Sequence, residues 1–127
     1  MLKRLMMGLF CVGLANIAFA NDSVIVTIEN HSLYNIDYVY SMQRTKITSD
    51  NLPAYIAPDS SLMLQLASPD TTTPTAVFTL TLMTGVQGVA PMCAVQVADK
   101  TVTVTESYET NCYIDKSTGN VVVSYPS

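Results

Sequence analysis

The sequence predicts an all-β domain, an antiparallel β-sandwich of the immunoglobulin-like kind with seven or eight strands and one disulfide bond. Apolar residues recur at every second position in most segments, as they do in strands with one buried face. Turn-forming residues separate these segments at intervals of roughly 8 to 14 residues, which is typical of sandwiches. No segment shows the 3.6-residue spacing of an amphipathic helix. A small β-barrel is the alternative architecture.

The chain opens with the three parts of a secretory signal peptide. Lys3 and Arg4 give a positive start, an apolar run follows, and Ala18-Phe19-Ala20 forms a small-x-small cleavage site. The apolar run is shorter than the roughly 20 residues of a membrane span. We therefore expect a signal peptide over residues 1–20, cleaved after Ala20, and a single domain over residues 21–127 that is periplasmic or secreted. An uncleaved N-terminal anchor is the alternative.

Each predicted strand follows from its own alternation. Residues 23–29 place three aliphatic side chains on one face, and residues 33–42 place three tyrosines and an isoleucine there. The other predicted strands cover residues 61–66, 75–83, 93–98, 100–106, 111–115 and 120–125. Val, Ile, Thr and Tyr, which suit a half-buried pleated surface, are frequent in them. The residues expected inside are Val24, Val26, Ile28, Leu62, Leu64, Leu66, Ala76, Phe78, Leu80, Leu82, Cys93, Val95, Val97, Val102, Val104 and Ile114.

Turn residues punctuate these strands. Gly, Pro, Asn, Asp and Ser favour turns because they tolerate or preset unusual backbone angles. They gather at residues 49–53, 57–60, 68–74, 85–91 and 115–120. No repeat or linker indicates a second domain.

Two cysteines, Cys93 and Cys112, remain once the signal peptide with Cys11 is removed. An even number of cysteines in an oxidising compartment predicts one disulfide bond. A redox-active pair is typically a Cys-x-x-Cys motif, which the sequence lacks. The bond joins either neighbouring strands or the two sheets, and the sequence does not distinguish these geometries.

The expected mature chain is acidic. It keeps all ten acidic residues but only four basic ones, for a net charge of −6. So few cations leave no basic stripe to neutralise phosphates, and we expect no nucleic-acid partner. Anionic membrane surfaces are disfavoured for the same reason. Residues 75–98 are apolar on average, but Thr, Gly and Pro interrupt them, so we expect no transmembrane segment after signal cleavage.

The alternating row Tyr34, Ile36, Tyr38 and Tyr40 has two interpretations. Tyrosine rings combine apolar area with a hydroxyl, as a surface that grips a ligand such as a glycan requires. The opposite face, which begins with Asn35 and Asp37, is far more polar, and the more apolar face of a strand turns inward. We therefore predict that the tyrosine row is mainly core, with a ligand face as the alternative.

Catalytic and metal sites find little support in the sequence. His31, the only histidine, lies in a stretch that we expect to form a surface turn, and no Gly-x-Ser-x-Gly motif surrounds a serine. Zinc needs three or four converging His, Cys or carboxylate ligands, and this chain cannot supply His or thiolate ligands in that number. The spacing of an EF-hand is absent too, and isolated carboxylates such as Glu106 and Glu109 offer only a remote calcium alternative. We predict a non-enzymatic protein without a cofactor.

Two loops are candidate interaction surfaces. Residues 68–75 combine two prolines with four threonines and one charge between two apolar strands, which indicates an exposed, fairly stiff loop. Residues 84–92 place apolar side chains among glycines, as in a flexible apolar tip. In both cases a plain connection is the alternative. The candidate contact residues are Asp70, Thr71, Thr72 and Thr73 in the first loop and Val86, Gln87 and Val89 in the second.

The layout of short strands resembles that of small exported sandwiches such as aegerolysins, fimbrial subunits and chagasin-like inhibitors. The Gly-x-Gly-Gly and Arg-Pro-aromatic loops of the chagasin type do not occur here, so no residue roles carry over. The working hypothesis is an exported, non-enzymatic sandwich that binds a protein or glycan partner. A surface-assembly subunit that pairs strands with its neighbours is one alternative, and a membrane-active protein is another.

Overall fold

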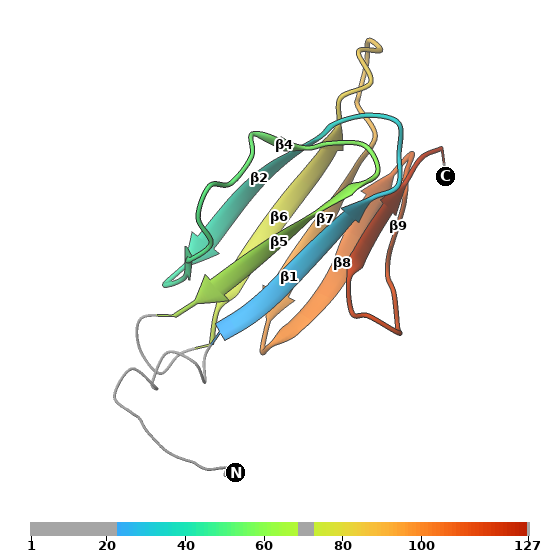
Figure 1. Ribbon diagram of the computed structural model, residues 1–127. Helices are drawn as coiled ribbons and strands as arrows, with labels where there is room; N and C mark the ends of the chain where they lie inside the picture. The colour runs from blue at the N-terminus through green and yellow to red at the C-terminus, as the bar shows by residue number, and fades with distance from the viewer. Residues whose placement is uncertain (1–22, 69–72, 127) are drawn as a thin grey trace, which may run out of the picture.

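The computed structural model describes residues 23–68 and 73–126, which form strands and loops without a helix (Figure 1). Ten strands build two separate five-stranded sheets. Their bounds are β1 Ser23–Asn30, β2 Ile36–Gln43, β3 Lys46–Ile47, β4 Tyr55–Ile56, β5 Ser60–Ala67, β6 Thr75–Leu82, β7 Met92–Ala98, β8 Thr101–Tyr108, β9 Asn111–Ile114 and β10 Val121–Ser124. The predicted signal peptide lies outside the described residues.

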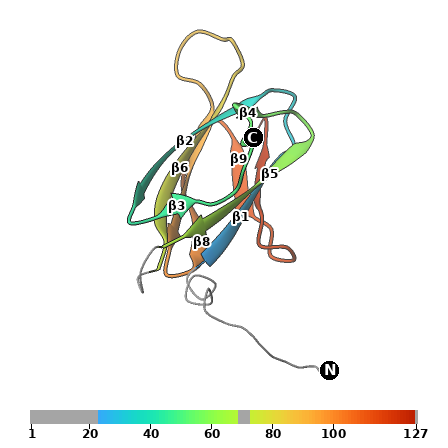
Figure 2. The ribbon, with the colours of Figure 1, turned by 60° about the vertical axis from the view of Figure 1, so that its left-hand side comes forward.

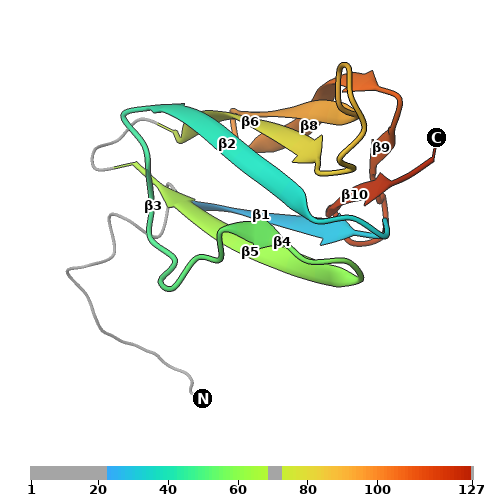
Figure 3. The ribbon, with the colours of Figure 1, turned by 90° about the horizontal axis from the view of Figure 1, so that it is seen from above.

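The sheets lie face to face as two layers, which Figure 3 shows from above. The first sheet has the order β3-β5-β1-β10-β9 and the second has the order β4-β2-β6-β7-β8. All neighbours are antiparallel except β1 and β10, which run parallel where Ile28–Asn30 pairs with Val121–Val123. Because the two sheets share no strand, the predicted sandwich is confirmed and the barrel alternative is wrong.

The core lies between the sheets and consists of the side chains that the alternation placed inward. The alternating residues of β1, β5 and β6 named above are all buried, and Ile28, Leu64 and Phe78 are completely so. Cys93, Val95 and Val97 of β7 join them, while Val102, Val104 and Ile114 are only partly buried against the core. Burying such aliphatic side chains contributes about 25 cal/mol per Å² of apolar surface, which makes this face the main source of stability.

The strand count exceeds the predicted seven or eight because β3 and β4 were not predicted. Both lie between β2 and β5, in a segment that pairs first with β5 and then with β2. Each contains only two residues, so neither displays an alternation that a sequence pattern reveals. Together they cover parts of the outer edges of β5 and β2.

The loops gather at two ends of the sandwich. One end, here called the tip end, carries loops 31–35, 57–59, 83–91 and 109–110. The opposite end, the far end, carries turns 44–45 and 99–100. Loop 83–91, yellow to orange, rises well beyond the sheets in two views (Figures 1 and 2).

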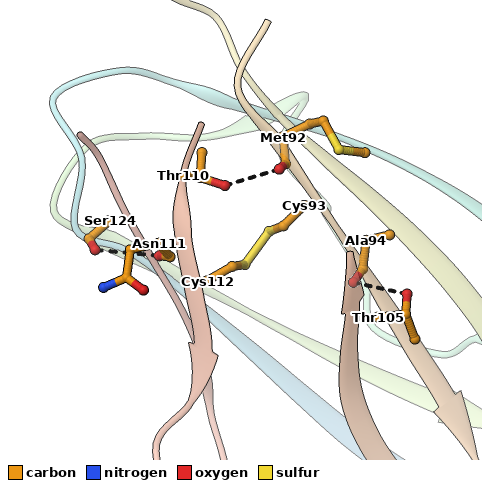
Figure 4. Close-up of a disulfide and its surroundings, with 8 residues drawn as sticks. All are labelled: Met92, Cys93, Ala94, Thr105, Thr110, Asn111, Cys112 and Ser124. Carbon is orange, nitrogen blue, oxygen red and sulfur yellow. Dashed lines mark hydrogen bonds between the residues drawn. A yellow bond between two sulfur atoms is a disulfide. The ribbon is translucent and has the colours of Figure 1, made fainter. Parts of the chain in front are cut away.

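The disulfide bond between Cys93 and Cys112 is confirmed. Cys93 lies on β7 of the second sheet and Cys112 on β9 of the first, with their Cα atoms 6.5 Å apart (Figure 4). Close by, the Thr110 Oγ1 hydroxyl donates to the Met92 carbonyl oxygen at 3.0 Å. The bond therefore joins the two sheets, which settles the geometry that the sequence left open.

Candidate interaction surface

The loop between β6 and β7 exposes the apolar residues that the sequence singled out. Val86 and Val89 are 74% and 76% exposed, and Gln87 between them is exposed as well. Met83, at the start of the loop, is 53% exposed. The loop is therefore exposed and apolar, and its role as an interaction surface stays a prediction.

Local chemistry explains how the loop stands away from the sheets. Its base is fixed by backbone hydrogen bonds: Met83 donates to the Asn35 carbonyl at 2.9 Å, and Leu82 donates to the Pro91 carbonyl at 2.9 Å. Above the base, Gly85 and Gly88 have φ angles of 75° and 106°, which glycine adopts at little cost. A Cβ added at either glycine has no atom within 4 Å, so the backbone angle and not lack of space requires glycine.

A second loop adds to the apolar surface at this end. Leu33, in loop 31–35, is 81% exposed, and the hydrogen bond from Met83 to Asn35 holds its loop against the base of loop 83–91. We call Leu33, Met83, Val86 and Val89 the apolar tip. Sequence reasoning placed Leu33 at the start of a strand and missed its role, because only the structure shows that β2 begins at Ile36.

Charge is distributed unevenly between the two ends. Loop 83–91 contains no ionisable residue, and the loops and strand starts around it carry acidic groups such as Asp37, Asp59 and Glu109. Within the described residues, every lysine and arginine lies toward the far end, either in β3 or in a connection between strands: Arg44, Lys46, Lys100 and Lys116. Among the described residues, the apolar tip therefore has an acidic rim without lysine or arginine.

The other predicted loop does not contribute to this surface. Asp70, Thr71 and Thr72 lie outside the described residues, and Thr73 is half-buried next to buried Pro74. Thr73 lies two residues before Thr75, the first residue of β6, which pairs with Gln43 at the far end. Of the candidate residues that the structure describes, Thr73 thus lies toward the far end, whereas Val86, Gln87 and Val89 lie at the tip end.

The tyrosine row is divided between core and rim. Ile36 is completely buried, and Tyr34 and Tyr38 are partly buried against the core, so the core prediction is confirmed for these residues. The Tyr38 hydroxyl donates to the Pro53 carbonyl oxygen, and desolvation raises the pKa of Tyr38. Tyr40 is 43% exposed, which makes the core prediction wrong for this residue.

The exposure of Tyr40 follows from the position of β2. Beyond Asp37, no strand pairs with the outer edge of β2, so the inward face there opens to solvent. Tyr40 packs sideways against Tyr38 and Phe78, with ring centroids 6.5 Å and 6.0 Å apart. One aromatic ring that lies at a sheet edge and rests on its neighbours is a weak basis for a glycan site.

A polar depression of about 520 Å³ includes the only histidine. The His31 Nε2 atom lies 2.9 Å from the Glu29 Oε1 atom, and the Asn120 side-chain amide donates to Glu29 Oε2 at 2.6 Å. These two hydrogen bonds, that from Asn120 foremost, lower the pKa of Glu29. Ser60, which also lines the depression, donates its hydroxyl to the Ala57 carbonyl and not to the histidine. The arrangement links β1 to the β9–β10 loop.

Neither a metal centre nor a helical membrane span emerges from residues 23–68 and 73–126. No three His, Cys, Asp or Glu side chains converge there as ligands. This part of the chain also contains no helix of the length and hydropathy that crossing a bilayer requires.

Comparison with known proteins adds no family. No protein-family model matches the sequence, and no curated protein matches it significantly.

Proposed function

We propose that this protein is an exported, non-enzymatic β-sandwich that acts by binding a protein partner through the apolar tip. The observation that supports this proposal is the exposure of Val86 and Val89. They lie on a loop that projects beyond the sheets and whose first and last residues are held by backbone hydrogen bonds. Apolar side chains that project together from a soluble domain mark interaction sites more often than scattered exposed residues do.

The chemistry of the tip favours a protein over a glycan or a membrane. Its four side chains are aliphatic or thioether groups, without an aromatic ring to stack on a sugar. It has no lysine or arginine to approach anionic lipid and no tryptophan or tyrosine to settle at a bilayer interface. Aliphatic side chains with an acidic rim suit an apolar pocket with basic residues around it.

Export is part of the proposal and rests on residues 1–20 and on the disulfide bond. The N-terminal residues have the pattern of a signal peptide. A disulfide that joins two sheets across a core is typical of proteins that fold in an oxidising compartment.

The test compares capture of partners by three forms of the protein in its native compartment, with bound proteins cross-linked and identified. The Val86→Asp, Val89→Asp double variant should lose the partner, because each carboxylate must be desolvated on docking. Met63→Asp is the matched control, since Met63 is an exposed apolar residue on β5, outside the tip. It should retain the partner.

One outcome of this capture would contradict the proposal, and two further measurements complete the experiment. A tip variant that melts like the wild type and captures the same partner would show that the binding surface lies elsewhere. Wild-type protein that sediments with phosphatidylcholine vesicles, while the tip variant does not, would replace the protein partner with a membrane. The His31→Ala variant should keep full biological effect, and a folded variant without effect would overturn the non-enzymatic assignment.

A further inference from the structure

The far end of the sandwich contains a groove with both apolar and polar residues in its lining, the polar ones including Thr27, Thr101, Thr118 and Asn120. It has a volume of about 540 Å³, within the range of pockets that hold drug-sized ligands. Val24 and Ile25 of β1, Val102 of β8 and Ile114 of β9 line it, and Lys100 lies at its margin. We call it the far-end groove.

The groove exists because β10 is short. It contains four residues and pairs with β1 only along Ile28–Asn30, so no strand lies beside Val24–Thr27 on that side. On the other side, β5 pairs with β1 along its whole length. The gap leaves the flank of the core open and leaves one side of the β1 backbone without a strand partner.

The apolar tip and the far-end groove are complementary in three respects. They lie at opposite ends of the molecule, since the groove includes the first half of β1 and the tip lies beyond its last residue. The tip projects aliphatic side chains and one thioether, and four of the groove's lining residues, Val24, Ile25, Val102 and Ile114, are aliphatic. The tip has an acidic rim, and Lys100 borders the groove.

We propose that the partner of the apolar tip is a second copy of this chain, whose far-end groove receives Val86 and Val89. This inference rests on the proposed function, because it assigns a partner to the same tip. The contact is heterologous: it uses a different surface on each copy, so a pair retains one free groove on the copy that inserts its tip and one free tip on the copy that receives it. Repetition of such a contact generates a ring or an open filament.

The contact should be weak for a single pair. A loop in a groove buries less than the 1,200–2,000 Å² or so of a standard interface. Association should therefore appear only at high protein concentration, up to about 1 mM. Salt should weaken it, because the contact between Lys100 and the acidic rim is solvent-exposed.

Sedimentation velocity across a concentration series provides the test. The wild type should form species that grow beyond dimers as concentration rises. The tip variant Val86→Asp, Val89→Asp and the groove variant Ile25→Asp, Lys100→Glu should each remain monomeric. Ile25 and Lys100 are exposed, so the groove variant should fold, which a thermal melt verifies. The variant Val86→Thr, Val89→Thr, which keeps the shape of each side chain but adds a hydroxyl that must be buried, should reduce association at least about tenfold.

The decisive arm mixes the two defective variants. The tip variant keeps an intact groove and the groove variant keeps an intact tip, so the mixture can form one contact and no second. It should yield one-to-one dimers and nothing larger. A mixture that stays monomeric, or a wild type that stays monomeric at about 1 mM, would overturn the proposal.

The outcome is separable from that of the proposed function. If the wild type is monomeric but the tip variant loses a foreign partner, the binding role of the tip stands and self-assembly is wrong. If self-assembly survives the tip variant, both the head-to-tail contact and the role of the tip in it are wrong.

Discussion

At the scale of single residues, Asn30 ties together three segments at the tip end. Its side chain is completely buried. The amide nitrogen donates to the carbonyl oxygens of Tyr34 and Ile56 at 2.7 and 2.9 Å, and the amide oxygen accepts from the Ser32 backbone nitrogen and hydroxyl. Asn30 thereby holds loop 31–35, which carries Leu33, against β4.

Replacing Asn30 with Ala should reduce the free energy of unfolding by about 3 kcal/mol, because several buried polar groups lose their partners together. Urea denaturation followed by circular dichroism measures this loss. Asn111→Ala is the control: Asn111 is exposed, and its replacement should change stability by less than about 0.5 kcal/mol. An unchanged midpoint for Asn30→Ala would show that water replaces these bonds without cost.

The tyrosine row shows what a residue pattern does and does not determine. The alternation correctly predicted that the side chains of Tyr34, Tyr38 and Tyr40 lie on the inner face of the strand. It gave no information about whether another strand covers that face. The segment that contains Pro53, 15 residues along the chain, covers Tyr38 and accepts a hydrogen bond from its hydroxyl. Tyr40 lies beyond Ile36 and Asp37, the residues of β2 that pair with β4.

At the scale of elements, the connections between the sheets matter more than any single strand. On one side, β3 and β4 cross between the sheets, and on the other, β8 and β9 are consecutive strands that belong to different sheets. The Cys93–Cys112 bond lies on this second side and connects β7 to β9. It closes a loop with a sequence separation of 19 residues that includes all of β8.

The double variant Cys93→Ala, Cys112→Ala should fold but lose about 2–4 kcal/mol of stability, since the bond restricts the unfolded chain. Chemical denaturation of both forms gives the difference. The processed chain, which lacks Cys11, should show no reactive thiol when it is denatured without a reductant. One reactive thiol per chain or more would contradict the bond.

The hydrogen bonds to Glu29 should make part of the stability depend on pH. The pKa of Glu29 is lowered from its ordinary 4.5, foremost by Asn120. The folded state thus favours the carboxylate. The resulting stabilisation is present above the unfolded pKa and disappears as pH falls through the folded pKa.

Thermal melts of the wild type and Asn120→Ala between about pH 6 and pH 3 measure this contribution. The difference in melting temperature should be largest near pH 6 and shrink below the ordinary pKa of 4.5. Asp115, whose pKa the Ser117 backbone and side chain also lower, keeps those partners in both forms. A difference that is independent of pH would show that Asn120 acts through packing alone.

At the scale of the whole molecule, the sandwich is asymmetric from end to end. The apolar tip with its acidic rim lies at one end, while the basic residues of the described chain and the far-end groove lie toward the other. The sheets are asymmetric from side to side as well. β6 is paired on both sides along nearly its whole length, whereas β8 forms an edge of its sheet.

Hydrogen exchange should reveal this difference. Amide protons of β6 should exchange only through global unfolding, and at least about 100-fold more slowly than those on the outer edge of β8, which open locally. Exchange followed by NMR at low protein concentration measures both sets of rates without interference from association. Equal protection of the two strands would mean that the edge of β8 is covered in solution.

The sequence by itself determined the features that depend on near neighbours. Alternation identified the all-β class, all the long strands and the buried faces of β1, β5 and β6, because the two faces of a strand follow from a period of two residues. Glycines at positions 85 and 88 marked an exposed loop, because they permit backbone angles that other residues avoid. The even number of cysteines outside the predicted signal peptide predicted the disulfide bond between Cys93 and Cys112.

Only the tertiary structure decided which surfaces remain open. That Tyr40 is exposed and that Leu33 lies at the same end as Met83, Val86 and Val89 both depend on pairings between distant residues. The far-end groove is the clearest case: it depends on the pairing of Ile28 with Val121, which lie at opposite ends of the described chain. A local pattern records which face of a strand is apolar, but the register between distant strands determines what covers that face.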